Sequence, residues 1–221
     1  MIISRGRRYI FVHIPKTGGT SLALALESKA MKDDVLIGDT PKAVNRRRRL
    51  KGVETSGRLW KHSRLADIYG LVTEAEIESF FVFTLVRNPW DRIVSYYHWL
   101  QVQTFDHPAV ALAKSMDFSA FLSHPETVAA FRAGPYVSYV ADVQGRDQCD
   151  LYLRLEHLNG DIPALEGRLG FRLPPMERVN TSARSRDWRP YFSDADASHW
   201  AEVCAKDIAQ FCYEFDPAAD R

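Results

Sequence analysis

Residues 10–21, IFVHIPKTGGTS, constrain the fold more than any other part of the chain. The run begins with three apolar residues, two of them β-branched, which predict a buried strand over residues 8–14. After the glycine pair comes LALAL at residues 22–26, and these good helix formers predict a helix over residues 19–31. The chain must therefore pass from a strand through a tight glycine turn directly into a helix.

A turn of this kind is suited to binding an anion. The first backbone N–H groups of a helix have no partner within the helix, and they lie at the positive end of its dipole. Lys16 adds a full positive charge, and hydroxyl groups come from Thr17, Thr20 and Ser21. A glycine pair after a strand is often only a turn, so the loop alone leaves phosphate binding open.

Two further strands follow along the chain. Residues 80–86, FFVFTLV, form a continuous apolar run, which is typical of a strand covered on both faces in a parallel sheet. Residues 151–155 are a third candidate strand, and residues 32–58 are expected to be rich in loops. Helices are expected at 73–79, 89–101, 116–123, 162–169 and 194–213. This alternation predicts an α/β fold of three layers, with a central, mostly parallel sheet flanked by helices, in a single domain over residues 1–221.

The amino-acid composition bears on what the protein binds, on the state of its cysteines and on its location. The formal net charge of +1 gives no general attraction to nucleic acid or to a membrane surface. Three cysteines without metal-ligand spacing fit reduced thiols better than a disulfide framework. The sequence has no apolar stretch of membrane-spanning length and no cleavable leader pattern, so we expect a cytoplasmic protein without a membrane span.

A second anion site is predicted where the strand at residues 80–86 ends. Asn88 is a good N-cap and Pro89 suits the first position of a helix. Arg87 stands at the carboxyl end of the strand, and Ser95 lies two turns along the helix, so both could reach one anion. Ligands of open α/β sheets bind at the carboxyl ends of strands. Two anion sites there predict a ligand with two separated phosphate-type groups.

Both segments resemble the nucleotide-binding motifs of sulfotransferases, most closely the carbohydrate-type branch, sulfotransferase family 2. IPKTGGTS is similar to that family's 5′-phosphosulfate-binding loop, and RNPWDRIVSYY resembles its 3′-phosphate-binding motif. The resemblance extends over nearly the whole chain, through KHSRLADI at 61–68, YLRLEHL at 152–158, VNTSARSRDWRPYFSD at 179–194 and KDIAQFCYEF at 206–215.

The resemblance implies a P-loop-like fold and 3′-phosphoadenosine 5′-phosphosulfate (PAPS) as the sulfuryl donor, without a metal. The acceptor would be a hydroxyl group, commonly on a glycan or glycolipid. By the same resemblance the 5′ end of the donor is held by Lys16, Thr17, Gly18, Gly19, Thr20 and Ser21. The 3′-phosphate is held by Arg87 and Ser95, and Arg184 is a further candidate for contact with the nucleotide.

Sulfuryl transfer is an in-line displacement in which the protein positions the reactants and stabilises charge. Lys16 is placed to meet the negative charge that grows on the leaving phosphate. An acceptor hydroxyl also needs a general base, for which we favour His62. An unperturbed histidine, with a pKa of about 6.5, is largely neutral at physiological pH, and His62 resembles in position the catalytic histidine of some glycan sulfotransferases. Glu156 is the rival candidate and His98 the third.

Two other functions remain open at this point. A P-loop kinase requires Gly-x₄-Gly-Lys-[Ser/Thr], whereas here Pro15 precedes the lysine and the glycines follow it. A nucleotide-binding module that has lost catalysis would bind the donor without transferring the sulfuryl group. The sequence leaves undetermined the acceptor, the oligomeric state and the role of the basic run from Arg46 to Arg49. That run is either a solvated stretch or a patch that attracts an anionic ligand.

Overall fold

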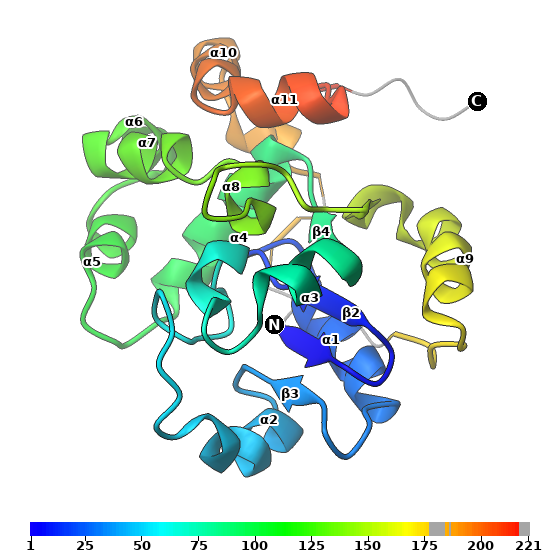
Figure 1. The fold of residues 1–221 in the computed structure, drawn as a ribbon. Helices are drawn as coiled ribbons and strands as arrows, with labels where there is room; N and C mark the ends of the chain where they lie inside the picture. The colour runs from blue at the N-terminus through cyan, green and yellow to red at the C-terminus, as the bar shows by residue number, and fades with distance from the viewer. Residues whose placement is uncertain (177–183, 186, 217–221) are drawn as a thin grey trace. The chain divides into compact units, whose positions relative to one another are not determined.

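The computed structural model describes residues 1–176, 184–185 and 187–216 (Figure 1). Its contacts divide the chain into two compact units. The first unit comprises Met1–Val86 and Tyr136–Val179, and the second comprises Arg87–Pro135 and Asn180–Arg221.

The first unit is built on a five-stranded sheet with the strand order β3-β1-β2-β4-β5. The strands are β1 (Ile2–Ser4), β2 (Tyr9–Val12), β3 (Val35–Leu36), β4 (Phe81–Val86) and β5 (Leu151–Arg154). The pairs β2–β4 and β4–β5 are parallel, and β1 is antiparallel to both of its neighbours. Four of the five strands therefore run in one direction, which confirms the predicted α/β fold with a mostly parallel sheet.

Each face of this sheet carries its own apolar cluster, because successive side chains of a strand point to opposite faces. On one face Phe11 and Phe83 pack with Leu22 of the first helix and with Leu165 of the helix after β5. On the other face Ile10, Val12 and Val82 pack with apolar side chains from the segments around residues 65–77. Burial of β4 on both faces explains why residues 80–86 contain so many apolar side chains.

The helices of the first unit are α1 (Gly19–Ser28), α2 (Pro41–Arg46), α3 (Glu74–Ser79), α8 (Val137–Val140) and α9 (Leu158–Leu169), with 3₁₀ helices at Arg47–Leu50, Leu65–Ile68 and Leu155–His157. α1 ends at Ser28, three residues earlier than expected. The expectation of a loop-rich segment at residues 32–58 is wrong in part, since β3, α2 and a 3₁₀ helix lie there. β1 and β3 were not predicted, because strands of three and two residues are too short to show periodicity.

Helices make up the regular structure described in the second unit. They are α4 (Pro89–Gln101), α5 (Pro108–Ser115), α6 (Phe118–Ser123), α7 (Pro125–Arg132), α10 (Asp194–Val203) and α11 (Ala205–Phe211), with a 3₁₀ helix at Arg189–Tyr191. The single helix expected over residues 194–213 is two helices that meet at Cys204. Trp200, fully buried, packs in a cluster with Trp90 and Phe121. None of the helices described in either unit is long and apolar enough to span a bilayer.

Candidate active site

The loop between β2 and α1 has an unusual backbone. Lys16 has a φ of 65° and Gly18 a φ of 85°, so both occupy the left-handed region. This conformation is costly for a lysine, and such strain is typical of ligand-binding loops. Left-handed residues in a turn direct neighbouring N–H groups into a concavity that favours anions, and here the turn leads into the N-terminus of α1.

Packing beneath the loop fixes this shape. Thr17 is fully buried, and its hydroxyl donates to the carbonyl oxygen of Ile14 at 2.9 Å. A Cβ atom at Gly18 would lie 2.7 Å from Cδ1 of Leu155, and one at Gly19 would collide with the His13 ring. The two glycines therefore allow Leu155 and His13 to approach the loop closely. Because the Thr17 hydroxyl proton is already used, this residue would contact an anion through its backbone N–H.

His62 lies beside the same loop. Its Nδ1 is 2.8 Å from the carbonyl oxygen of His13, and the two imidazole rings meet edge to face with 4.7 Å between centroids. A carbonyl oxygen can only accept, so Nδ1 carries the proton and Nε2 keeps its lone pair. Burial lowers the pKa of His62 to about 4 and also lowers the pKa of His13. His62 is thus a neutral proton acceptor at physiological pH.

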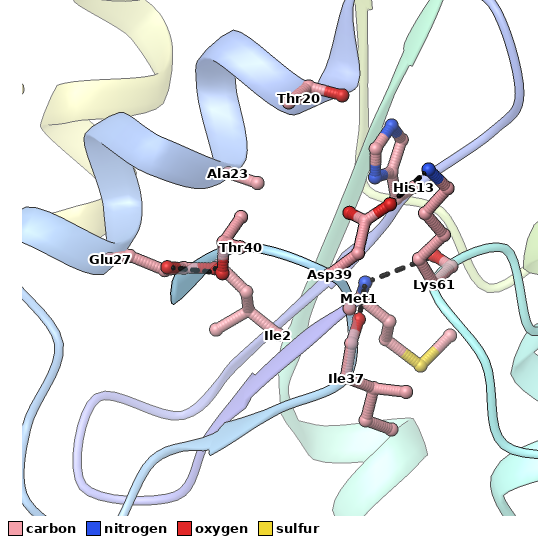
Figure 2. A pocket seen from close by; sticks show the side chains of 11 residues that line it. Met1, Ile2, His13, Thr20, Ala23, Glu27, Ile37, Asp39, Thr40 and Lys61 are labelled. Atoms are coloured by element: carbon pink, nitrogen blue, oxygen red, sulfur yellow. Dashed lines mark hydrogen bonds and ion pairs between the residues drawn. The ribbon is translucent and has the colours of Figure 1, made fainter. Parts of the chain in front are cut away.

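A small pocket adjoins the loop on the side of α1 that carries Thr20, Ala23 and Glu27 (Figure 2). At its inner end the buried Glu27 carboxylate accepts a hydrogen bond from the Thr40 hydroxyl at 2.8 Å. The remaining lining comes from Met1, Ile2, His13, Ile37, Gly38, Asp39 and Lys61. The sequence motifs did not indicate this pocket, because much of its lining comes from segments outside them.

Asp39 and Lys61 form an ion pair at this pocket, with 2.6 Å between the carboxylate oxygen and Nζ (Figure 2). Both stand close to His62, since Lys61 precedes it in the chain and the charge of Asp39 acts on its pKa. The sequence analysis did not select Asp39, because a single polar residue in a loop does not distinguish a site residue from a surface residue.

In the second unit, the start of α4 is anchored by segments from the C-terminal part of the chain. The Asn88 side chain accepts from the Trp90 backbone N–H at 3.1 Å, and it donates to the carbonyl oxygen of Glu214 at 2.9 Å. The indole N–H of Trp200 donates to the Pro89 carbonyl oxygen at 3.1 Å. Asn88 and Pro89 thus begin the helix in the positions that the sequence predicted.

Arg87 and Arg184 are brought together by Asp91. One carboxylate oxygen of Asp91 accepts from Arg87 Nε at 2.7 Å, and the other accepts from Arg184 Nη2 at 2.6 Å. All three side chains are at most 13% exposed. Ser95 is buried one helical turn after Asp91 on α4. The second unit therefore contains Arg87 and Ser95, which were expected at the 3′-phosphate, and Arg184, which was expected as a further contact with the nucleotide. Residues 179–183 and 186 of the resembling tail lie outside the described residues.

The rival bases occupy different surroundings. Glu156 is exposed in the 3₁₀ helix that follows β5, next to the Leu155 that packs on Gly18. His98 belongs to the second unit, where its ring lies 5.1 Å from that of Tyr191, and burial, followed by the charge of Arg184, lowers its pKa. Of the three candidates, His62 combines proximity to the lysine-bearing loop with a fixed tautomer.

The basic run from Arg46 to Arg49 has a partly structural role. Arg46 ends α2 and donates to the carbonyl oxygens of Met31 at 2.8 Å and Asp34 at 3.0 Å. The three arginines that follow are exposed in a 3₁₀ helix, so the run is helical and does not form the loop that was expected.

Comparisons with known proteins agree with this fold. A model of the sulfotransferase family matches residues 1–211. Among the matching solved structures is mouse sulfotransferase SULT7A1 complexed with PAP, with a TM-score of 0.51 and 15% sequence identity over 91% of this chain and 84% of that one. No curated protein sequence matches the chain significantly. Because the family model covers all but the last ten residues, the chain belongs to the sulfotransferase family.

Proposed function

We propose that this protein transfers a sulfuryl group from PAPS to an acceptor hydroxyl, with residues 1–221 acting as one sulfotransferase domain. The observation that carries the proposal is the left-handed, lysine-bearing loop at the N-terminus of α1, with a neutral histidine held beside it. The donor is inferred from the family and from the PAP in the mouse structure.

The 5′ end of PAPS would bind at the loop. Backbone N–H groups from Thr17 to Thr20, together with the α1 dipole, suit the phosphosulfate anion, whereas the Ser21 N–H already donates to the Gly18 carbonyl oxygen at 3.2 Å. The Lys16 ammonium would stabilise the charge that develops on the bridging oxygen as the sulfur–oxygen bond breaks. These groups supply positive charge without a metal ion.

The 3′-phosphate would bind to the guanidinium groups of Arg87 and Arg184, with the Ser95 hydroxyl as a further donor. Two guanidinium groups on one carboxylate form a rigid set of donors, and planar donors of this kind suit phosphate oxygens. If binding requires the 3′-phosphate, the protein would bind PAPS in preference to ATP, which lacks that group.

His62 would act as the general base. Its Nε2 takes the proton of the acceptor hydroxyl while the oxygen attacks sulfur in line with the leaving phosphate. The lowered pKa keeps the ring unprotonated, and the negative charge of a bound donor would raise that pKa towards a value suited to catalysis. Glu156 and His98 remain the alternatives.

The acceptor is proposed to be a carbohydrate, on a glycan or glycolipid, because the sequence most resembles the carbohydrate-type branch. A cytoplasmic location is proposed from the three cysteines, each of which is a free thiol in the structure.

Thermal shift with 3′,5′-ADP, ADP and magnesium-ATP tests the donor. We expect preferential stabilisation by 3′,5′-ADP, because a ligand that binds only the folded state raises its stability. A larger shift with magnesium-ATP would contradict the proposal and favour a kinase.

A transfer assay then distinguishes an enzyme from an inactive binding module. It follows the transfer of labelled sulfate from PAPS to acceptors in cell extracts, with the wild-type protein and with His62→Ala. Turnover by the variant would reject His62 as the base.

A further inference from the structure

The basic run from Arg46 to Arg49 is not used in the proposed chemistry. It belongs to a stretch, residues 29–51, that contains eight lysines and arginines and three aspartates, which gives a local charge of +5. The whole chain carries only +1, so the remaining residues have a net negative charge. A charge asymmetry of this kind indicates an interaction with an anionic surface.

Two arginines of the run attach it to the turn that follows α1. Arg46 donates to the carbonyl oxygens of Met31 and Asp34 at 2.8 and 3.0 Å. Arg49 donates to the carbonyl oxygen of Lys32 in the same turn. The run and the turn therefore form one continuous surface. Its exposed cations, whose side chains form no ion pair with any residue that the structure describes, are Lys29, Lys32, Arg47, Arg48 and Lys51.

This surface also exposes apolar side chains. Val44, Arg47 and Arg48 stand at i, i+3 and i+4, so they share one face of α2 and of the 3₁₀ helix that continues it. Val44 is 47% exposed, and Met31 in the turn is 38% exposed. Ala43, on the side of α2 that packs on the protein, is buried in an apolar cluster. We call Met31, Val44 and the five exposed cations the basic surface.

The combination of cations with exposed apolar side chains favours a lipid bilayer over other polyanions. Clusters of about four to eight lysines and arginines on an amphipathic helix are typical of segments that bind anionic lipids. An exposed valine or methionine gains free energy where it enters the boundary between headgroups and acyl chains, whereas the phosphates of a nucleic acid need only cations. Single-stranded nucleic acid is bound by aromatic side chains that stack on its bases, and the basic surface contains no aromatic residue.

We propose that the basic surface binds an anionic lipid bilayer, with its cations on the headgroups and with Val44 and Met31 inserted between them. The surface lies at the C-terminal end of α1, and the phosphate loop lies at the N-terminal end, roughly 15 Å away along the helix. A bilayer at one end of α1 would leave the loop at the other end open to the donor. This inference does not depend on the proposed function.

Sedimentation with lipid vesicles tests the proposal on the intact protein, without any nucleotide. The vesicles contain equimolar phosphatidylcholine and phosphatidylserine, and vesicles of pure phosphatidylcholine are the neutral control. We expect the wild-type protein to bind the anionic vesicles at low salt, to be released from them at high salt, and not to bind the neutral ones.

Two changes separate the charged part of this surface from the apolar part. Arg47→Gln combined with Arg48→Gln should weaken binding to the anionic vesicles about 25-fold, since each cation near such a surface contributes about fivefold. Val44→Ser keeps the charge and should weaken the binding about three- to tenfold, because less apolar surface enters the bilayer. Lys114→Gln combined with Lys206→Gln removes the same charge from exposed positions of the second unit, and should bind as the wild type does.

Each variant is first checked for an unchanged melting temperature, and the salt dependence of the wild-type protein tests the proposal without any variant. Absence of binding to the anionic vesicles, equal binding to the neutral ones, or an equal loss in the two double variants would overturn the proposal. Wild-type binding by Val44→Ser would overturn it as well, because the contact would then be purely electrostatic. Binding of duplex DNA in preference to the vesicles would make the basic surface a nucleic-acid site instead.

Discussion

Asp91 joins Arg184 to Arg87, although Arg184 lies 93 residues further along the chain than Asp91. A carboxylate inside a predicted phosphate site is unexpected, because it repels an anion. Because Asp91 lies between two guanidinium groups, its role is structural. It neutralises part of their mutual repulsion and fixes the orientation of both, so that the remaining N–H donors keep fixed directions.

Asp91→Asn should therefore destabilise the protein. Two largely buried guanidinium groups would lose their shared counter-charge, and removing one partner of a buried ion pair costs roughly 3–5 kcal/mol. Urea unfolding should show this loss, whereas Asp106→Asn at an exposed position should change the free energy of unfolding by less than about 0.5 kcal/mol. Equal stability of the two variants would mean that Asp91 does not hold the arginines.

Arg184→Gln should weaken binding of 3′,5′-ADP but not of 5′-AMP. Loss of a charge-assisted contact with the 3′-phosphate costs about 1.5–3 kcal/mol, which is about 10- to 150-fold in the dissociation constant. Titration calorimetry with both nucleotides gives the ratio, and Arg87→Gln should behave alike. Arg189→Gln is the matched control, because that arginine pairs with Asp187 and Asp216 on the surface. An equal loss for both nucleotides would place Arg184 away from the 3′-phosphate.

The parts of the site that follow from local chain order were predictable from the sequence. The strand, glycine turn and helix at residues 10–21 are contiguous, and so are the N-cap at Asn88 and the helix after it. Hydrophobic periodicity and capping chemistry act over a few residues, so they can be read from a single sequence.

The remaining parts depend on contacts between distant segments. The bond from His62 to the His13 carbonyl, the pairing of Asp39 with Lys61 and the Asp91–Arg184 contact join residues 22 to 93 positions apart. No periodicity encodes such pairs, and a single sequence has no other signal for them. For the same reason the pocket beside α1 became visible only in the folded chain.

Lys16→Ala should slow sulfuryl transfer by a larger factor than it weakens nucleotide binding. If Lys16 stabilises the charge of the transition state, its loss should cost about 3–4 kcal/mol, or roughly 10²–10³-fold in kcat. Transfer rates with saturating PAPS, together with the dissociation constant for 3′,5′-ADP, separate the two effects. Lys51→Ala removes an exposed lysine as a control. A loss confined to binding would show that Lys16 acts before the chemical step.

Gly19→Ala should distort the loop, because the new methyl group would collide with the buried His13 ring. Overpacking of this kind typically costs about 1–3 kcal/mol. Gly160→Ala is the matched control: this glycine lies within α9 and a Cβ there meets no atom within 4 Å, so the change should stabilise the helix by up to about 1 kcal/mol. Thermal unfolding that ranks the two variants in the opposite order would contradict the packing of His13 on the loop.

Acid should destabilise the protein through His62 before most carboxylates titrate. The pKa of this histidine falls from 6.5 in the unfolded chain to about 4 in the folded protein. Between those values the unfolded chain binds the extra proton, so the stabilisation is complete above pH 6.5 and is lost as the pH falls towards 4. One such group corresponds to about 2 kcal/mol between pH 7 and pH 5.

Urea unfolding at these two pH values should show a loss at least this large, since the pKa of His13 is lowered too. His62→Asn should remove about 2 kcal/mol of the difference, while His157→Asn at an exposed site should leave it unchanged. If His62→Asn keeps the full pH dependence, His62 is not the buried neutral base that the site requires.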